Sequence, residues 1–402
     1  MLGVIGPTTT SQFRGNETIA LGDEKRFSHG RPIDEGLGVV RNYGGTMRRW
    51  VAVLLLAACS GEAATTSTEV SESTSISSTS TITTLASTTS TTSASTTTTT
   101  IGLLAVTEVV EFPVPAGSRP HDVAPAPDGT VWYSGQGNET LGRLDPTSGE
   151  VVEIPLGPGS APHGVIVGPD GMPWITDSGL NALIRVDPDS GEVTSFELPG
   201  ANINLNTAVF DHEGLLWFTG QSGAFGSLNP ADGELNVFEA PRGRGPYGIT
   251  VTPANEVFYA SLAGNHIALI NSDGTATIVE PPTAQQGSRR VWSDSRGTVW
   301  VSEWEAGQVG AYQPAAGTWQ EWALPGESPS AYAVYVDETD RVWLTDFTGD
   351  GAIVRFDPET ESFESFPLQT SGGNVRQLLG RPGEVWGAES AADALVVVRY
   401  GD

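Results

Sequence analysis

The sequence predicts an all-β protein, a seven-bladed β-propeller, and three observations support this prediction. One copy of a repeat, residues 289–310, reads as an antiparallel hairpin with a polar turn. The last repeat lacks a fourth strand, whereas the first repeat has a spare one. An aromatic residue also recurs every 41 to 43 residues, each time just after a turn, at Trp132, Trp174, Trp217, Phe258, Trp300, Trp343 and Trp386.

Each repeat divides into four short strands. The folded part, residues 106–402, begins near Val106, and in its second unit we expect strands at 164–167, 174–176, 183–186 and 193–198. The last unit stops after a third strand at 395–400. The spare strand at 106–112 should therefore complete the last blade, which closes the ring and removes an exposed sheet edge.

Three segments precede the repeats. Residues 1–46 are polar and glycine-rich without a repeat signal, and we interpret them as a non-native upstream extension or a disordered segment. Residues 47–59 combine two arginines, a short apolar run and Leu-Ala-Ala-Cys, which is typical of a bacterial lipoprotein signal ending at Cys59. A chance cysteine after a weak apolar segment is the alternative. Residues 60–105 are rich in Ser and Thr and predict a disordered linker.

This arrangement predicts an extracytoplasmic bacterial protein that meets the membrane only through a lipidated Cys59. In the native host, Cys59→Ala should move the protein from the membrane fraction to the soluble fraction, because no lipid can then be attached. Cell fractionation followed by immunoblotting measures this shift. Identical partitioning of wild type and variant would show that the lipoprotein interpretation is wrong.

Composition and charge exclude several classes of function. The chain carries 48 acidic and 20 basic side chains, a net charge of −28, so its surface should repel nucleic-acid backbones. Its single cysteine excludes disulfides within the chain and sites that need several cysteines. The sequence contains no zinc signature, no phosphate-binding loop and no nucleophile elbow. We expect a monomer without a nucleic-acid partner.

The repeat register predicts two rings of side chains at one end of the central channel. Most members are polar where packing alone would accept alanine or valine, which indicates a site for a small-molecule or peptide-like ligand. A wet channel mouth that simply collects polar residues is the alternative. The first ring, at the entrance to each first strand, is His121, His163, Asn206, Tyr247, Arg289, Tyr332 and Val375. The second, just past each second strand, is Gly135, Asp177, Gly220, Ser261, Glu303, Asp346 and Glu389.

The chain resembles the virginiamycin B lyases, also called streptogramin B lyases. The resemblance is carried by PHGVIVGPDGMPWITDSGLNALIRVDP (residues 162–188) and by residues 289–310 and 328–347, and it covers all seven repeats. It implies a propeller enzyme that linearises cyclic depsipeptide antibiotics by magnesium-dependent elimination at the ester linkage. Such chemistry needs a base beside the ester carbonyl and a cation that holds the developing enolate charge.

The family's catalytic positions are only partly retained. Its essential acid corresponds to Glu303. Its general-base histidine falls on Arg289, the acidic residue two positions earlier falls on Gly287, and the histidine one blade earlier falls on Tyr247. Arginine cannot act as the neutral-pH base that histidine would provide. The resemblance therefore implies the fold and a ligand-facing channel, and leaves the lyase reaction open.

A displaced site with the family's spacing lies in the first two blades. His121 and His163 are 42 residues apart, and Asp177 follows His163 by fourteen. In this hypothesis His163 is the base, and His121 and Asp177 are orienting residues or ligands of Mg²⁺. Glu303, at the family's acid position, would either orient Arg289 and Arg290 or bind the divalent cation.

Three functions remain open at this point. The first is the lyase reaction. The second is a non-catalytic propeller that binds an anionic or glycan-like ligand, and the third is a scaffold that binds another protein through its loops. A channel histidine with a free nitrogen near a carboxylate favours chemistry, whereas a mouth dominated by arginine favours binding. The expected ligand-binding residues are Arg289, Arg290, Tyr247, Tyr332, Trp304 and Arg376.

Overall fold

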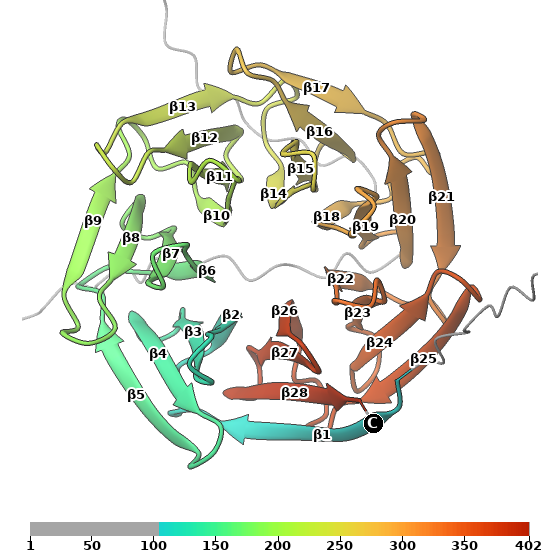
Figure 1. The fold of residues 1–402 in the computed structure, drawn as a ribbon, viewed down its shortest axis with the longest axis horizontal. Coiled ribbons are helices and arrows are strands. Elements are labelled where there is room, and N and C mark those ends of the chain that lie inside the picture. Colours follow the sequence, from blue (N-terminus) through green and yellow to red (C-terminus); the bar gives the residue numbers. More distant parts are fainter. Residues whose placement is uncertain (1–103, 402) are drawn as a thin grey trace, which may run out of the picture. The chain divides into compact units, whose positions relative to one another are not determined.

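A computed structural model describes residues 104–401, and these residues form seven four-stranded antiparallel sheets around a central axis (Figure 1). The predicted seven-bladed propeller is confirmed. Cys59 and nearly all of the segments predicted before the first blade lie outside the described residues. Among the described residues, no helix is long and apolar enough to cross a membrane.

Strands occupy equivalent places in every blade. The inner strands are β2 (Pro120–Pro125), β6 (Pro162–Val167), β10 (Leu205–Phe210), β14 (Pro246–Val251), β18 (Ser288–Ser293), β22 (Ala331–Val336) and β26 (Val375–Arg381). The second strands are β3 (Val131–Gly135), β7 (Pro173–Asp177), β11 (Leu216–Gly220), β15 (Val257–Ser261), β19 (Val299–Glu303), β23 (Val342–Asp346) and β27 (Glu384–Glu389). The third strands are β4 (Thr140–Asp145), β8 (Ala182–Val186), β12 (Ala224–Leu228), β16 (His266–Ile270), β20 (Gln308–Gln313), β24 (Ala352–Asp357) and β28 (Ala394–Tyr400). The outer strands are β5 (Glu150–Pro155), β9 (Val193–Glu197), β13 (Leu235–Glu239), β17 (Ala276–Val279), β21 (Thr318–Ala323), β25 (Ser362–Pro367) and β1 (Val106–Pro113).

The N-terminal strand closes the ring, as predicted. Blade 7 has the strand order β1-β28-β27-β26, so its outer strand comes from the opposite end of the described chain. The β1–β28 pairing is antiparallel and runs from Val106 opposite Tyr400 to Pro113 opposite Ala394. This pairing satisfies the backbone groups that β28 would otherwise expose along its edge.

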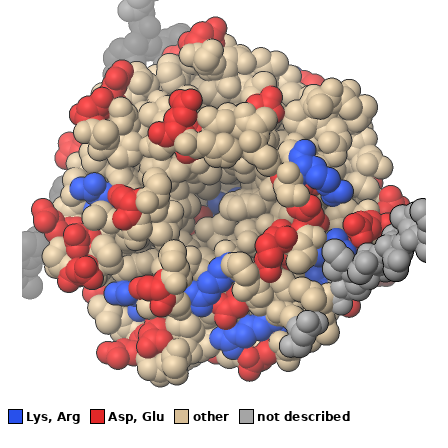
Figure 2. Space-filling view, viewed as in Figure 1, with Lys and Arg blue, Asp and Glu red and all other residues tan. Residues whose placement is uncertain are grey.

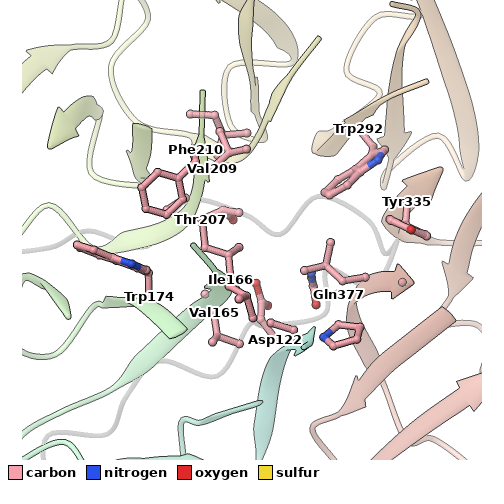
Figure 3. A pocket seen from close by; sticks show the side chains of 18 residues that line it. Asp122, Val165, Ile166, Trp174, Thr207, Val209, Phe210, Trp292, Tyr335 and Gln377 are labelled. Atoms are coloured by element: carbon pink, nitrogen blue, oxygen red, sulfur yellow. The ribbon is translucent and has the colours of Figure 1, made fainter. Parts of the chain in front are cut away.

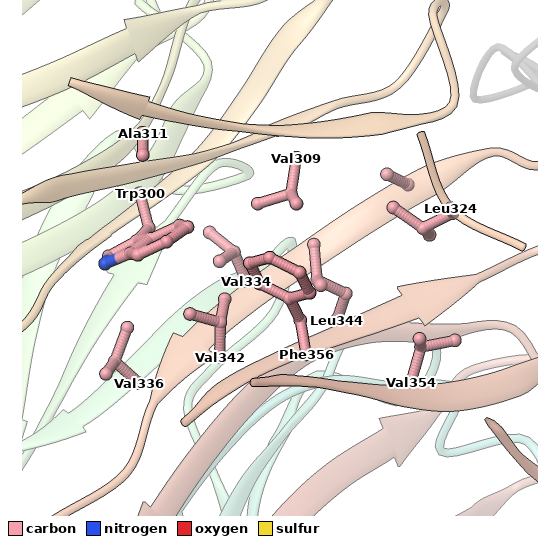
Figure 4. Close-up of a cluster of buried hydrophobic side chains, with 11 residues drawn as sticks. Trp300, Val309, Ala311, Leu324, Val334, Val336, Val342, Leu344, Val354 and Phe356 are labelled. Atoms are coloured by element: carbon pink, nitrogen blue, oxygen red, sulfur yellow. The ribbon is translucent and has the colours of Figure 1, made fainter. Parts of the chain in front are cut away.

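The core lies between neighbouring blades and is built around the recurring aromatic residues. Trp300 of blade 5 is 2% exposed and packs with Val334, Val342 and Phe356 of blade 6 (Figure 4). The Trp300 and Phe356 ring centroids are 6.0 Å apart. Asp294, in the preceding turn, accepts a hydrogen bond of 3.2 Å from the Trp300 indole N–H. The regular spacing of these aromatic residues in the sequence therefore reflects the repeated contact between neighbouring blades.

A hydroxyl group on the second strand also joins adjacent blades near the channel. Ser302 Oγ accepts from the Arg290 backbone N–H (3.0 Å) and donates to the Tyr332 carbonyl oxygen (2.7 Å) of the next blade. The register of β18 against β19 shifts between Ser288 and Val291, and this bulge frees the Arg290 N–H from the strand ladder. Equivalent hydroxyl bridges are made by Ser134, Thr176 and Thr219.

Candidate functional site

The inner strands bring polar side chains together in the channel, at the centre of the ring where Figure 2 shows a hollow. Each inner strand begins with a bulge of the kind seen in blade 5, so two successive side chains can approach the channel. Contacts among these side chains connect blades on opposite sides of the ring. The residues that meet are His121, Asp122, His163, Asn206, Thr207, Tyr247, Arg289, Arg290, Tyr332 and Arg376.

A buried ion pair crosses the channel. Arg290 of blade 5 donates from both terminal nitrogens to Asp122 of blade 1, at 2.7 Å to Oδ1 and 3.2 Å to Oδ2. The two side chains are only 4% and 1% exposed. Water does not screen such a pair, and removing one partner would leave a buried charge. Arg290 and Asp122 therefore fix blades 1 and 5 relative to each other.

The two predicted histidines lie in contact beside this ion pair, with their ring planes tilted by 43°. The His121 and His163 ring centroids are 3.7 Å apart, and His121 Nδ1 lies 2.8 Å from Asp122 Oδ1. Burial lowers the pKa of His121 well below its usual value, and the positive charges of Arg376, Arg290 and Arg289 lower it further. His121 is therefore neutral at pH 7 and donates its Nδ1 proton to the carboxylate.

The second histidine is held by hydrogen bonds from blade 3. Asn206 Nδ2 donates to His163 Nε2 (3.2 Å), while Thr207 Oγ1 donates to Asn206 Oδ1 (2.9 Å) and accepts from Arg290 (2.8 Å). Burial, and then the neighbouring His121, lower the pKa of His163. With Nε2 accepting, the proton of neutral His163 resides on Nδ1, which is buried and has no hydrogen-bond partner among the described residues.

Aromatic rings surround Arg289. Its guanidinium carbon lies 3.6 Å from the ring centroid of Tyr332, 4.6 Å from that of Tyr247 and 5.1 Å from that of Trp304. The two tyrosine hydroxyls are 2.6 Å apart, and Arg289 donates to Tyr247 Oη at 3.2 Å. Arg376 donates to Tyr332 Oη at 3.3 Å. The expected ligand-binding residues therefore form one cationic and aromatic cluster.

The second ring does not form a matching set of channel side chains. Asp177 organises the loop around it, because its carboxylate accepts from Ser160 Oγ and from the backbone N–H groups of Ala161, Gly179 and Leu180. Asp346 accepts from two loop amides in the same way. The carboxylate grouped with the two histidines is Asp122, which contacts His121, and Asp177 is not part of this group.

Glu303 lies inside blade 5, against the neighbouring strand β20. Its Oε2 accepts from Gln308 Nε2 at 2.5 Å, and a Cβ atom added to Gly310 would lie 2.8 Å from Oε1. Burial raises the pKa of Glu303 to about 8, and the charge of Glu321 adds to this effect. Glu389 of blade 7 has a similar environment, and burial followed by Glu111 raises its pKa to about 8. Both carboxyl groups are therefore largely protonated at pH 7.

The donor set does not suit a magnesium ion. Among the described residues, His121, Asp122 and His163 form a group whose candidate ligand atoms all lie within 4.8 Å of one another. However, both oxygens of Asp122 already accept from Arg290, and a divalent cation there would meet this guanidinium. Mg²⁺ prefers several oxygen ligands, whereas Asp177 accepts hydrogen bonds from its own loop and Glu303 accepts one from Gln308 inside blade 5.

Comparison with known proteins agrees with this architecture. The profile of the virginiamycin B lyase family matches residues 66–356, which is most of the chain. The chain belongs to this family. No match was found among curated protein sequences.

Solved structures of virginiamycin B lyases have the same fold. A streptogramin B lyase structure is 22% identical with a TM-score of 0.67, and the match covers 73% of this chain and 98% of that one. A virginiamycin B lyase from Staphylococcus aureus is 19% identical with a TM-score of 0.68, covering 73% and 99%. A catalytically inactive histidine-to-alanine variant of the S. aureus lyase, with quinupristin, gives the same values of 19%, 0.68, 73% and 99%. Such identities establish a common fold only.

Sequence reasoning missed Asp122 and Thr207. Asp122 connects Arg290 to His121, and Thr207 connects Arg290 to Asn206. Both directly follow first-ring positions, His121 and Asn206. They reach the channel because of the bulge at the start of each inner strand, which disturbs strict alternation of side chains. Sequence periodicity alone does not reveal such a bulge.

The raised pKa of Glu303 predicts a specific pH dependence of stability. The folded state holds this proton between the ordinary pKa of about 4.5 and the folded value of about 8, so wild type loses stability as the pH rises through that window. Glu303→Gln cannot lose a proton and should gain stability relative to wild type between pH 5 and pH 9, by at most about 1.4 kcal/mol per pH unit. Urea unfolding at both pH values measures this difference.

Exposed Glu305, two residues away, provides the matched control. Glu305→Gln should follow the wild-type pH dependence. If Glu303→Gln also follows it, the Glu303 carboxyl group is not held protonated by burial.

Proposed function

We propose that this protein is a ligand-binding propeller of the virginiamycin B lyase family in which the family's elimination reaction has been lost. The packing of Arg289 at the position of the family's base is the observation that supports this proposal. Its guanidinium group is held against three aromatic rings, of Tyr247, Trp304 and Tyr332. Arginine stays protonated at neutral pH and so cannot remove a proton beside an ester carbonyl.

The family's acid position argues in the same direction. Glu303 is buried within blade 5, and its carboxyl group is largely protonated at neutral pH. In this state it supplies no negative charge that could orient a base in the channel.

The ligand class follows from the groups that converge on Tyr332. The guanidinium carbons of Arg289 and Arg376 lie 3.6 and 5.7 Å from its ring centroid. Planar guanidinium groups bind carboxylates in a bidentate manner and also donate to carbonyl oxygens. Arg376 and Trp304 are only half-buried, and they provide the accessible part of the cluster. The proposed ligand is a small or peptide-like molecule that presents carboxylate or carbonyl groups.

One observation favours elimination at a displaced site as a second candidate function. Neutral His121 is oriented by Asp122 at 2.8 Å, an arrangement that positions histidine as a general base in many enzymes. This geometry exchanges the roles assigned from the sequence, because His121 and not His163 has the carboxylate partner. Burial and the surrounding arginines nevertheless lower the basicity of His121.

A direct assay with quinupristin distinguishes the two candidates. We expect the purified protein to leave quinupristin cyclic with and without magnesium, because no base of suitable pKa stands at the family position. Elimination opens the ring without adding water, so the product has the mass of the substrate and is detected by its chromatographic retention. The S. aureus virginiamycin B lyase is the positive control.

Turnover by wild type would contradict the binding proposal. His121→Asn would then identify the site responsible, because asparagine keeps a hydrogen-bond donor near Asp122 but cannot act as a base. Loss of turnover in this variant would establish the displaced site. Retained turnover would exclude both candidates.

A further inference from the structure

A cavity lies at the end of the channel opposite to the first ring. Its volume is about 350 Å³, within the size range of small-molecule sites. It is lined by the later residues of the inner strands, such as Ala124 and Pro125 of β2 and Val165 to Val167 of β6 (Figure 3). The inner strands run along the channel, so one end of each carries a first-ring residue and the other end reaches this cavity.

The cavity is chemically distinct from the arginine cluster. Asp122 contributes to its lining and at the same time forms the ion pair with Arg290 that crosses the channel. Of the residues proposed from the sequence as catalytic, ligand-binding or metal-binding, none lines it. The Asp122–Arg290 pair therefore separates two sites that differ in chemistry.

Aromatic side chains form two sides of the cavity. Trp174 and Phe210 lie on one side with ring centroids 5.6 Å apart, and Trp292 and Tyr335 lie on the other at 5.1 Å (Figure 3). Trp292, Phe210 and Val209 are only partly buried, although each is apolar. A flat apolar ligand placed against Phe210 or Trp292 would bury apolar surface that is still accessible and make an aromatic contact.

The polar part of the lining offers one hydrogen-bond donor and one acceptor. Gln377 Oε1 accepts from the Val123 backbone N–H at 2.9 Å, which fixes the orientation of the amide. Its Nε2 forms no hydrogen bond with the described residues and supplies the donor. Asp122 Oδ2 accepts only the 3.2 Å bond from Arg290 and can accept another.

A ligand group that matches the donor of Gln377 and the acceptor of Asp122 is uncharged. Arg290 already balances the charge of Asp122, so a charged group beside them would be buried without a counter-ion. A carboxamide or lactam has a carbonyl oxygen next to an N–H, and it can accept from Gln377 while it donates to Asp122.

We propose that this cavity binds a compact aromatic molecule that carries an uncharged carboxamide or lactam edge. The ring system lies in the apolar part of the cavity, where Phe210 and Trp292 are still accessible, and the amide edge meets Gln377 and Asp122. This second site is independent of the ligand proposed for the arginine cluster.

Ligand-observed NMR titration of the full-length protein with naphthalene-2-carboxamide tests the proposal. At a typical ligand efficiency, its ~13 non-hydrogen atoms predict a dissociation constant of about 1 mM or tighter. Naphthalene-2-carboxylate has the same shape but carries a charge and lacks the N–H, so it should bind about tenfold more weakly. Absence of carboxamide binding, or equal binding of both compounds, would overturn the proposal.

Two variants identify the site. Gln377→Glu retains an oxygen for the Val123 N–H but replaces the free donor with an acceptor, so carboxamide binding should weaken about tenfold. Val209→Phe fills part of the cavity and should weaken the binding of both compounds. The matched controls are Gln320→Glu and Val237→Phe on the exposed outer strands β21 and β13, and both should bind as wild type does.

If either folded cavity variant binds the carboxamide as tightly as its control, the proposal is wrong. The two variants act through different mechanisms, hydrogen bonding and space. One folded variant is therefore sufficient for a decision.

Discussion

The Asp122–Arg290 ion pair is the interaction on which the rest of the channel depends. It connects blades 1 and 5 across the centre of the ring, in a region that water reaches only slightly. His121 takes its orientation from the same carboxylate, and Thr207 links the same arginine to Asn206 and His163. Because each partner compensates a buried charge, neither can change without disturbing both the polar cluster and the lining of the cavity.

This constraint underlies the proposal that the protein binds a ligand and does not catalyse the family's elimination. The arginines concentrate positive charge in the channel, and they add to the effect of burial, which lowers the pKa of both histidines. The same guanidinium groups are suited to hold carboxylate or carbonyl groups of a ligand. The apolar clusters that hold neighbouring blades together consist of other residues, so the polar channel and the apolar core are separate parts of the structure.

The fold could be predicted because the recurring aromatic residues pack between neighbouring blades, six of them buried and Trp217 partly buried, so their spacing is the spacing of the blades. The first ring could be predicted because its members recur with the same blade spacing, and the structure does bring His121, His163, Tyr247, Arg289 and Tyr332 together. The second ring does not act as one group of side chains, because short carboxylates such as Asp177 accept hydrogen bonds from backbone amides of their own loop. The cavity was missed because it is lined by residues far apart in the sequence whose periodicity reads only as core.

A double-mutant cycle on Asp122→Asn and Arg290→Gln tests the central claim most directly. The free energy of unfolding would be measured by urea denaturation for wild type, both single variants and the double variant. We expect each single variant to lose about 3–5 kcal/mol, because each leaves a buried charge uncompensated, and the double variant to lose clearly less than the sum. Strictly additive losses would show that the two residues do not interact, and would contradict a channel divided by an ion pair.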